Sequence, residues 1–441
     1  MIQLLKEIII DSQQTTLVTG VQRHVKITSL TGKSTICMGI RRGGKSTLMN
    51  QIIQRLLESA IPRENILHIN FFDDRLHPLK QLGLSPVLEA YYGLYPEKKG
   101  TETIYCFFDE IQIIPNWESF IDRLMRSENC EVYLTGSSAH MLSQEIATQM
   151  RGRSLSWEVF PFSFSEFLDS KKISWRKSIS SKQRLLIQQA FDAFWESGGF
   201  PEVAHIADHQ LKIKIHQEYF QTVLFRDLIE RHNISHPKSL QDLAYRLIDT
   251  IASLYSITSL TGYLKSLGHK ISKETVSQYI SWFEDAYFLF TVRLFDASLA
   301  KSHANPKKIY CIDPAMATSI GSGILVNSGH LLENLIFISL RHVATSIYYF
   351  RTSNGKEVDF IIQRPDRSFL LIQVCDSLAE PKTRKREIAA LHQAMIELNT
   401  QEGFIVTRHE MEELTLEGTT ISVLPAWRFL LEIPSLIIGK P

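Results

Sequence analysis

The sequence predicts an α/β protein whose N-terminal part is a parallel β-sheet with helices on both faces. Two stretches lead to this prediction. Residues 36–49 read ICMGIRRGGKSTLM, so an apolar run is followed by closely spaced glycines and then by apolar residues at helical spacing. Residues 104–110 read IYCFFDE, an apolar run of strand length that ends in two carboxylates. Strands that are followed by helices in this way are typical of parallel sheets.

The glycine-rich stretch has the spacing of a Walker A motif. Gly39 is followed by four residues and then by Gly44-Lys45-Ser46. A strand, a glycine turn and a helix direct backbone N–H groups at a polyphosphate, and glycine lets the backbone approach the anion without a Cβ clash. Lys45 would reach the β- and γ-phosphates, and the Ser46 hydroxyl would coordinate Mg²⁺. The predicted nucleotide-binding residues are Gly39, Ile40, Arg41, Arg42, Gly43, Gly44, Lys45, Ser46 and Thr47.

A second GKST sequence, at residues 32–35, serves as a control. Ile27 stands where the upstream glycine of the motif belongs, and Ser34-Thr35 leads into a strand rather than a helix. We therefore expect this copy to form a turn, and only the copy at Gly44 to bind a nucleotide.

The composition is that of an ordinary folded protein. With 441 residues, 44% of them hydrophobic and 22% charged, the chain is long enough for two or three domains and too apolar for a disordered one. The net charge of +1 provides no general attraction to nucleic acid or to a membrane surface. Five scattered cysteines without a CxxC pair and the lack of a membrane-length apolar run favour a reduced, cytoplasmic protein without a membrane partner.

The carboxylates at the end of the second stretch match a Walker B motif. Asp109 would hold the Mg²⁺ shell, and Glu110 would polarise the attacking water. An apolar run that ends in Asp-Glu is common on its own, but its position downstream of a Walker A motif favours the functional interpretation. A later strand, residues 131–135, ends in Gly136-Ser137-Ser138. Ser137, or Thr135 before it, is a candidate sensor of the γ-phosphate, and the alternative is that Ser137 or Ser138 caps a helix.

Taken together, the ordered motifs resemble those of an AAA+-related ATPase family of bacteria and archaea. They read GIRRGGKST, CFFDEIQ, LTGSS, RGR and FPFSFSEF, with GGFPE and FRDL further on, so the resemblance spans nearly the whole chain. It implies ATP hydrolysis with Mg²⁺ as the cofactor. It also makes Arg151 or Arg153 a candidate arginine finger, with Arg153 preferred, and the alternative for each is a structural ion pair. Such fingers usually act between subunits, which implies a homo-oligomer by analogy.

Residues 240–312 have the pattern of a winged helix. A helix that starts after Ser272 would bury Val276, Tyr279, Ile280 and Phe283 on one face. Two strands, residues 288–295 and 309–312, would form the wing, with Lys301, His303, Lys307 and Lys308 between or at them. DNA is one candidate partner of this module and a protein is the other, because the helix presents no arginine and acidic residues dilute its charge.

The last third resembles a PD-(D/E)XK nuclease-like fold. Glu333 on a helix and Asp359 on a strand match the first two acidic positions of such sites. Gln373 stands where a glutamate belongs and Cys375 where a lysine belongs, so we expect no nuclease activity. For Asp359, a vestigial metal ligand and a solvated strand residue are both open.

The sequence thus predicts a P-loop AAA+-like ATPase domain over residues 1–170, a helical lid and winged-helix region over 171–315, and an inactive nuclease-like α/β domain over 316–441. The expected activity is hydrolysis of ATP to ADP and phosphate, coupled to a conformational change in the later domains. In this activity Lys45, Glu110, Ser137 and Arg153 would be catalytic, and Ser46 and Asp109 would hold the metal. The alternative is a nucleotide-gated DNA- or protein-binding regulator with little intrinsic turnover, and a metal-dependent nuclease is a third, weaker hypothesis.

Overall fold

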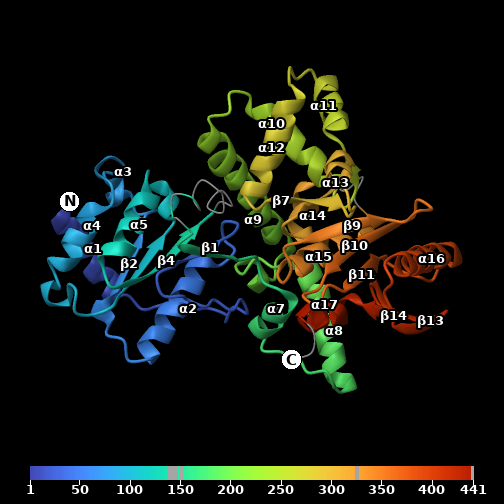
Figure 1. The fold of residues 1–441 in the computed structure, drawn as a ribbon, viewed down its shortest axis with the longest axis horizontal. Helices are drawn as coiled ribbons and strands as arrows, with labels where there is room; N and C mark the ends of the chain where they lie inside the picture. The colour runs from blue at the N-terminus through green and yellow to red at the C-terminus, as the bar shows by residue number, and fades with distance from the viewer. Residues whose placement is uncertain (138–147, 149, 151, 323–326, 439–441) are drawn as a thin grey trace. The chain divides into compact units, whose positions relative to one another are not determined.

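The computed structural model describes residues 1–137, 148, 150, 152–322 and 327–438. The chain divides into two compact units (Figure 1). The first unit comprises Met1–Phe160 with Asp285–Tyr287, and the second comprises Pro161–Glu284 with Phe288–Pro441. Among the described residues, no helix has both the length and the apolar character needed to cross a membrane.

The first unit is built on a five-stranded parallel sheet in the order β2-β3-β4-β1-β5. The strands are β1 (Ser34–Met38), β2 (Ile66–Asn70), β3 (Ile104–Asp109), β4 (Cys130–Gly136) and β5 (Ser154–Glu158). The helices are α1 (Ile2–Gln14), α2 (Lys45–Glu58), α3 (Leu79–Leu82), α4 (Ser85–Tyr92) and α5 (Trp117–Ser127). This sheet confirms the predicted α/β class.

Helices cover both faces of this sheet. Phe107 and Phe108 are neighbours in β3, so their side chains point to opposite faces. Phe107 shares a buried cluster with Met49 and Ile53 of α2, whereas the Phe108 ring contacts Phe120 of α5 at 6.2 Å between centroids. The apolar faces of α2 and α5 therefore pack against opposite faces of the sheet, on either side of β3.

The second unit contains a nine-stranded mixed sheet in the order β13-β14-β12-β11-β10-β9-β7-β8-β6. Its strands are β6 (Leu254–Tyr255), β7 (Leu289–Leu294), β8 (Lys307–Cys311), β9 (Ile347–Arg351), β10 (Glu357–Gln363), β11 (Phe369–Val374), β12 (Glu402–Thr407), β13 (Glu412–Leu416) and β14 (Thr419–Pro425). Its helices are α7 (Phe164–Ser170), α8 (Ser181–Ser197), α9 (His209–Thr222), α10 (Pro237–Ile248), α11 (Ile257–Ser266), α12 (Lys273–Asp285), α13 (Leu299–Ala304), α14 (Pro314–Ile320), α15 (Ser328–Arg341), α16 (Pro381–Glu397) and α17 (Ala426–Ile438). A π-helical segment, Val223–Glu230, continues α9.

The helix expected after Ser272 is α12. The Ser272 hydroxyl accepts a hydrogen bond from the N–H of Thr275 at 3.2 Å, and the predicted apolar face is buried. The two expected strands are present as β7 and β8, which pair antiparallel, while β6 pairs antiparallel with the other side of β8.

A single sheet crosses the boundary that we expected at residues 315/316. β7 pairs in parallel with β9, so the β6–β8 strands and the C-terminal strands belong to one sheet. The three-part division stays a prediction, and its second and third parts share this sheet.

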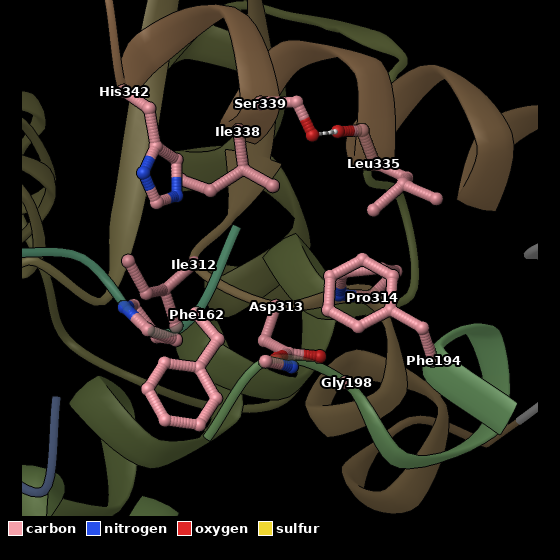
Figure 2. A pocket seen from close by; sticks show the side chains of 12 residues that line it. Phe162, Phe194, Gly198, Ile312, Asp313, Pro314, Leu335, Ile338, Ser339 and His342 are labelled. Atoms are coloured by element: carbon pink, nitrogen blue, oxygen red, sulfur yellow. Dashed lines mark hydrogen bonds between the residues drawn. The ribbon is translucent and has the colours of Figure 1, made fainter. Parts of the chain in front are cut away.

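A buried carboxylate joins two loops of the second unit. Asp313, which begins α14, accepts hydrogen bonds from the N–H groups of Gly199 at 2.7 Å, Ala315 at 2.8 Å and Met316 at 3.3 Å. Figure 2 shows this carboxylate beside Gly198, in a small cavity that is also lined by aromatic and aliphatic side chains. Gly198 has a φ of 68°, and a Cβ there would overlap the Asp313 carboxylate. The glycine pair of residues 198–199 is therefore needed for this close approach.

Candidate nucleotide-binding site

The Walker A stretch forms a loop between the end of β1 and the start of α2. Gly39 has a φ of 154°, and a Cβ at this position would overlap the carbonyl oxygen of Val159. Arg42 and Gly44 have positive φ angles of 63° and 98°, and α2 begins directly after Gly44. Loops with such successive turns direct backbone N–H groups into a concave, anion-binding surface at a helix N-terminus.

Other side chains hold this loop in place. Arg23, which is 5% exposed, donates to the carbonyl oxygens of Gly43 at 2.7 Å and Phe160 at 2.6 Å. Arg41 stacks over the ring of Phe72 at 5.0 Å from its centroid. The loop conformation is therefore stabilised by the rest of the first unit, and Arg23 was not anticipated from the sequence.

Lys45 extends along the loop toward the paired acids. Its ammonium donates to the carbonyl oxygens of Gly39 at 3.0 Å and Ile40 at 3.1 Å, and it lies 3.6 Å from Oε1 of Glu110. Only 4% of Lys45 is exposed. A buried ammonium that is held by two carbonyls and one carboxylate is positioned to meet an anion at the mouth of the loop.

The Walker A and Walker B residues meet at the edge of the sheet where the strands end. Oγ of Ser46, an exposed residue, donates to Oδ2 of Asp109 at 2.7 Å. The Thr135 hydroxyl, at the end of β4, donates to Oδ1 of Asp109 and accepts from the N–H of Glu110 at 2.9 Å. Thr135 thereby links both acids, and Glu110 has a φ of 55°, which turns the chain sharply after β3.

The side-chain oxygen atoms of Ser46 and Asp109 are suitable ligands for a hard divalent cation such as Mg²⁺. Mg²⁺ prefers oxygen ligands and is usually bound in such sites through one or two protein groups and the phosphates of the nucleotide. The Ser46 hydroxyl and the Asp109 carboxylate are within hydrogen-bond distance of each other beside the phosphate-binding loop. A metal ion between them would be bound by oxygen atoms that the fold already brings together.

Gln112 is a site residue that we did not single out from the sequence. Its Nε2 lies 2.5 Å from Oε2 of Glu110 and 3.4 Å from Oγ of Ser137, so it bridges these two side chains. Its Oε1 is buried without a hydrogen-bond partner in the part of the chain that the structure describes. Ser137 is 1% exposed, and Gln112 connects it to Glu110. The expected helix after Ser137 lies outside the described residues, and so does Ser138.

The structure places Arg153 away from the P-loop of its own chain. Arg153 precedes the first residue of β5, which runs parallel to β1, so it lies at the edge of the sheet where the strands begin. Its guanidinium lies 3.4 Å from the buried carboxylate of Asp122, which also binds Arg126 at 2.8 Å. Its role as an arginine finger stays a prediction that requires a second copy of the chain. Arg151 lies outside the described residues.

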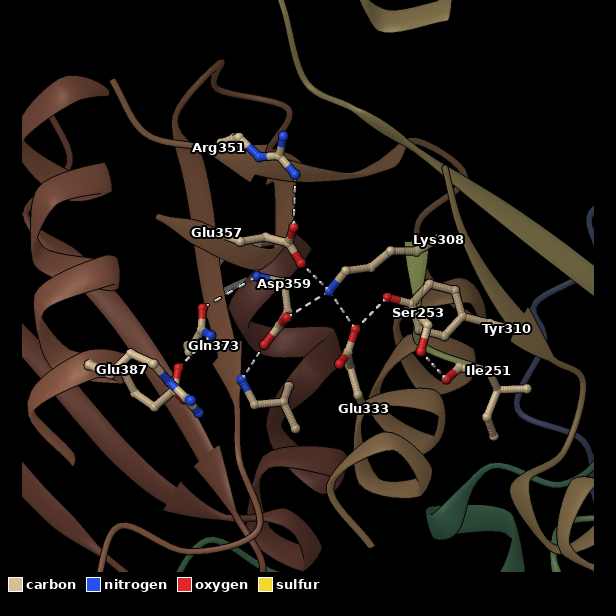
Figure 3. Close-up of polar contacts among 12 residues, drawn as sticks. Ile251, Ser253, Lys308, Tyr310, Glu333, Arg351, Glu357, Asp359, Gln373 and Glu387 are labelled. Carbon is tan, nitrogen blue, oxygen red and sulfur yellow. Dashed lines mark hydrogen bonds and ion pairs between the residues drawn. The ribbon is translucent and has the colours of Figure 1, made fainter. Parts of the chain in front are cut away.

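A second polar cluster lies in the second unit, where the sequence predicted an altered nuclease-like site (Figure 3). Glu333 and Asp359 come together there, but through Lys308, whose ammonium lies 2.8 Å from an oxygen of each. Asp359 is 6% exposed, so the interpretation of a solvated strand residue is wrong. Lys308, one of the basic residues that the sequence placed at the wing, is not available to contact DNA, because its side chain is buried among carboxylates.

Gln373 and Cys375, which stand at the two altered positions of the predicted nuclease-like site, are both buried. Gln373 accepts from the N–H of Asp359 at 3.3 Å and donates to Glu387 at 2.7 Å, so it has a structural hydrogen-bonding role. Burial raises the pKa of the Cys375 thiol to about 12, which keeps it protonated and uncharged at neutral pH.

Three family matches divide the chain in the same order. Residues 31–168 match the AAA domain family, residues 188–324 match a domain of unknown function, DUF8612, and residues 328–429 match another domain of unknown function, DUF4143. Among solved structures, the Orc1 protein of Aeropyrum pernix in complex with DNA covers 65% of this chain and 86% of its own length, with 12% identity and a TM-score of 0.30. The AMPPCP-bound DnaA of Aquifex aeolicus gives 9% identity and a TM-score of 0.28, over 64% of this chain and 86% of its own.

Two related sequences cover most of the chain. A protein of Methanocaldococcus jannaschii, MJ1544, described as uncharacterized, is 33% identical over 97% of this chain and 95% of its own length. An uncharacterized protein of Haemophilus influenzae is 28% identical over 78% of this chain and 83% of its own. The chain therefore belongs to the family of this archaeal protein, and it carries an AAA domain that is followed by two domains of unknown function.

Proposed function

We propose that this protein binds ATP with Mg²⁺ and hydrolyses it to ADP and phosphate. The observation that carries this proposal is the hydrogen-bonded chain from Ser46 through Asp109 and Thr135 to the backbone of Glu110, beside Lys45. These hydrogen bonds join both Walker motifs at the C-terminal ends of the parallel strands, where ligands of such sheets bind. The match of residues 31–168 to the AAA domain family supports nucleotide binding.

Each residue has a chemical role in this proposal. The backbone of residues 39–47 and the Lys45 ammonium bind the phosphates, and Ser46 and Asp109 hold the metal ion. Mg²⁺, when bound, neutralises charge on the phosphate oxygens. Glu110 accepts a proton from the attacking water, and Gln112 holds the Glu110 carboxylate in place.

Two variants test the assignment of these roles. We expect Lys45→Ala to lose ATP binding, because it removes the ammonium that meets the phosphates. We expect Glu110→Gln to bind ATP but to hydrolyse it about 10²- to 10⁴-fold more slowly, because the amide cannot accept the proton. Phosphate release and equilibrium binding of a labelled ATP are the measurements. Unchanged turnover in Glu110→Gln would rule out this residue as the base.

A second candidate function is that of a regulator, in which the second unit binds a partner and the bound nucleotide controls this binding. α10, β6, α11, α12 and β7 follow one another in the order of a winged helix, α13 is inserted before β8, and the strands pair as β7-β8-β6. The face of α12 opposite its buried residues presents exposed polar side chains, which are Lys273, Ser277, Gln278 and Ser281. A nucleotide-gated regulator would have slow basal turnover that DNA or a protein partner changes. Measuring ATP hydrolysis with and without duplex DNA separates this function from a constitutive ATPase.

A further inference from the structure

Three carboxylates converge on the ammonium of one buried lysine in the second unit (Figure 3). Nζ of Lys308, on β8, lies 2.8 Å from Oε1 of Glu333, 2.9 Å from Oε1 of Glu357 and 2.8 Å from Oδ1 of Asp359. Glu333 belongs to α15, and both other acids belong to β10. Lys308 is 3% exposed, so its charge depends on these carboxylates rather than on water.

Other groups help to fix the positions of these three carboxylates. Tyr310 donates to the same oxygen of Glu333 at 2.6 Å, the N–H of Val374 donates to Oδ2 of Asp359 at 2.9 Å, and Arg351 lies 3.5 Å from Oε2 of Glu357. The pairing of β10 with β9 shifts register between Val358 and Ile361, which places Asp359 at a β-bulge. Bulges of this kind redirect a side chain out of the regular alternation of a strand.

The carboxylates also line a large pocket. Glu333, Glu357 and Asp359 are part of the wall of a cavity of about 870 Å³, together with His330, Gln373 and Glu387. A cation from solution could therefore reach this wall. As the side chains stand, no group of three or more His, Cys, Asp and Glu residues among the described residues is arranged to hold a metal ion.

We propose that Glu333, Glu357 and Asp359 form a cation site whose resident cation is the ammonium of Lys308, and that the site accepts a divalent metal ion only when this ammonium is removed. The reason is geometric. The Lys308 nitrogen marks a point about 2.8 Å from three carboxylate oxygens, and Mn²⁺ or Ca²⁺ at that point would need them to move inward by only a few tenths of an ångström. The ammonium and a metal ion cannot share the position.

The electrostatics support a permanently charged lysine. Burial alone would lower the pKa of Lys308, but the charges of Asp359 and Glu333 outweigh this effect and raise the pKa. The ammonium therefore stays in place across the neutral range and ties β8 to α15 and β10. This tie joins the segment matched at residues 188–324 to the segment matched at residues 328–429.

The test uses the full chain with Lys308→Met, which keeps a long apolar side chain but removes the charge. Each protein also carries Asp109→Asn, so that the proposed metal ligand of the nucleotide site does not contribute. Mn²⁺ binding is measured by electron paramagnetic resonance without nucleotide, and thermal unfolding is followed with MnCl₂ or EDTA. Lys307→Met is the matched control, because Lys307 is the neighbouring lysine of β8 and faces Glu284 and Arg293 instead.

We expect Lys308→Met to bind a Mn²⁺ ion that the protein with Lys308 does not bind, and Mn²⁺ to raise its Tm by several degrees. Lys307→Met should behave as the protein with both lysines, and adding Asp359→Asn to Lys308→Met should remove the new Mn²⁺ site. A Lys308→Met protein that gains neither bound Mn²⁺ nor stability would overturn the proposal.

A second comparison keeps the proposal testable when Lys308→Met fails to fold. A Lys308→Met protein that folds only when Mn²⁺ is present supports the proposal. Independently, Asp359→Asn in the protein that retains Lys308 should leave Mn²⁺ binding unchanged. Loss of a bound Mn²⁺ ion in that variant would show that the native cluster already holds a metal ion, which contradicts the proposal.

Discussion

The hydroxyl of Ser46 donates a hydrogen bond of 2.7 Å to Oδ2 of Asp109, across 63 residues of sequence. The two residues meet because β4 pairs with β1 on one side and with β3 on the other, all three in parallel. The ends of these strands therefore lie along one edge of the sheet. Thr135 at the end of the middle strand then completes the connection between the Walker A and Walker B residues.

Thr135→Val should separate the hydrogen-bonding role of this residue from its packing. Valine has nearly the same shape but removes the hydroxyl that pairs with the N–H of Glu110 and with Oδ1 of Asp109, which costs about 1–3 kcal/mol of stability. We expect a lower free energy of unfolding and slower ATP hydrolysis. Thr135→Ser keeps the hydroxyl and should retain most of both, as measured by chemical denaturation and phosphate release. Full stability and activity in Thr135→Val, together with losses in Thr135→Ser, would show that the methyl group, not the hydroxyl, matters.

Gln112 should act as a positioning residue for Glu110. Gln112→Ala removes the amide that lies 2.5 Å from the Glu110 carboxylate, and we expect kcat to fall by about tenfold to 10²-fold with little change in KM. Gln112→Glu places a second negative charge there, so it should raise the pKa of Glu110 and shift the acidic limb of the pH–rate profile upward. An unchanged pH profile in Gln112→Glu would argue against contact between the two side chains in solution.

Arg153 should act on the nucleotide of a neighbouring copy. If it is the finger, Arg153→Ala and Glu110→Gln are each inactive, but mixing them restores hydrolysis, because a site can then combine Glu110 from one chain with Arg153 from the other. Arg126→Ala is the control, since Arg126 binds the same Asp122 carboxylate. Equal effects of Arg126→Ala and Arg153→Ala, with no recovery on mixing, would assign Arg153 to a structural ion pair.

The buried Asp313 carboxylate should make stability depend on pH. Burial raises its pKa from 3.8 to about 6, so the unfolded chain releases a proton in a range where the folded protein keeps it. The stabilising contribution of this group is complete below the unfolded pKa and is lost as the pH rises through the folded pKa, by about 3 kcal/mol in total.

Asp313→Asn tests this dependence because asparagine does not titrate. The difference in free energy of unfolding between the native protein and the variant should shrink as the pH is raised from about 4 to about 7. Urea denaturation at several pH values measures it. A difference that stays constant or grows with pH would mean that the three backbone N–H groups stabilise the ionised carboxylate more than burial destabilises it.

What the sequence by itself determined is local. The loop from Gly39 to Ser46, the start of α12 at its Ser272 cap and the apolar face of that helix all depend on backbone preferences and hydrogen bonds between near neighbours. Such interactions can be read from residue spacing. The order of glycines, serine and paired acids was therefore enough to predict the components of the candidate site, whose role in nucleotide binding stays a prediction.

Only the tertiary structure decided which strands are neighbours and what each polar side chain meets. Two examples result from packing between distant segments. They are the pairing of β7 with β9 and the position of Arg153 where the strands of the first sheet begin, at the opposite end from the P-loop. Lys308 is the clearest case. A lysine looks the same in a sequence whether water or three carboxylates surround it, because its environment is made by residues 25 to 51 positions away that the fold brings to it.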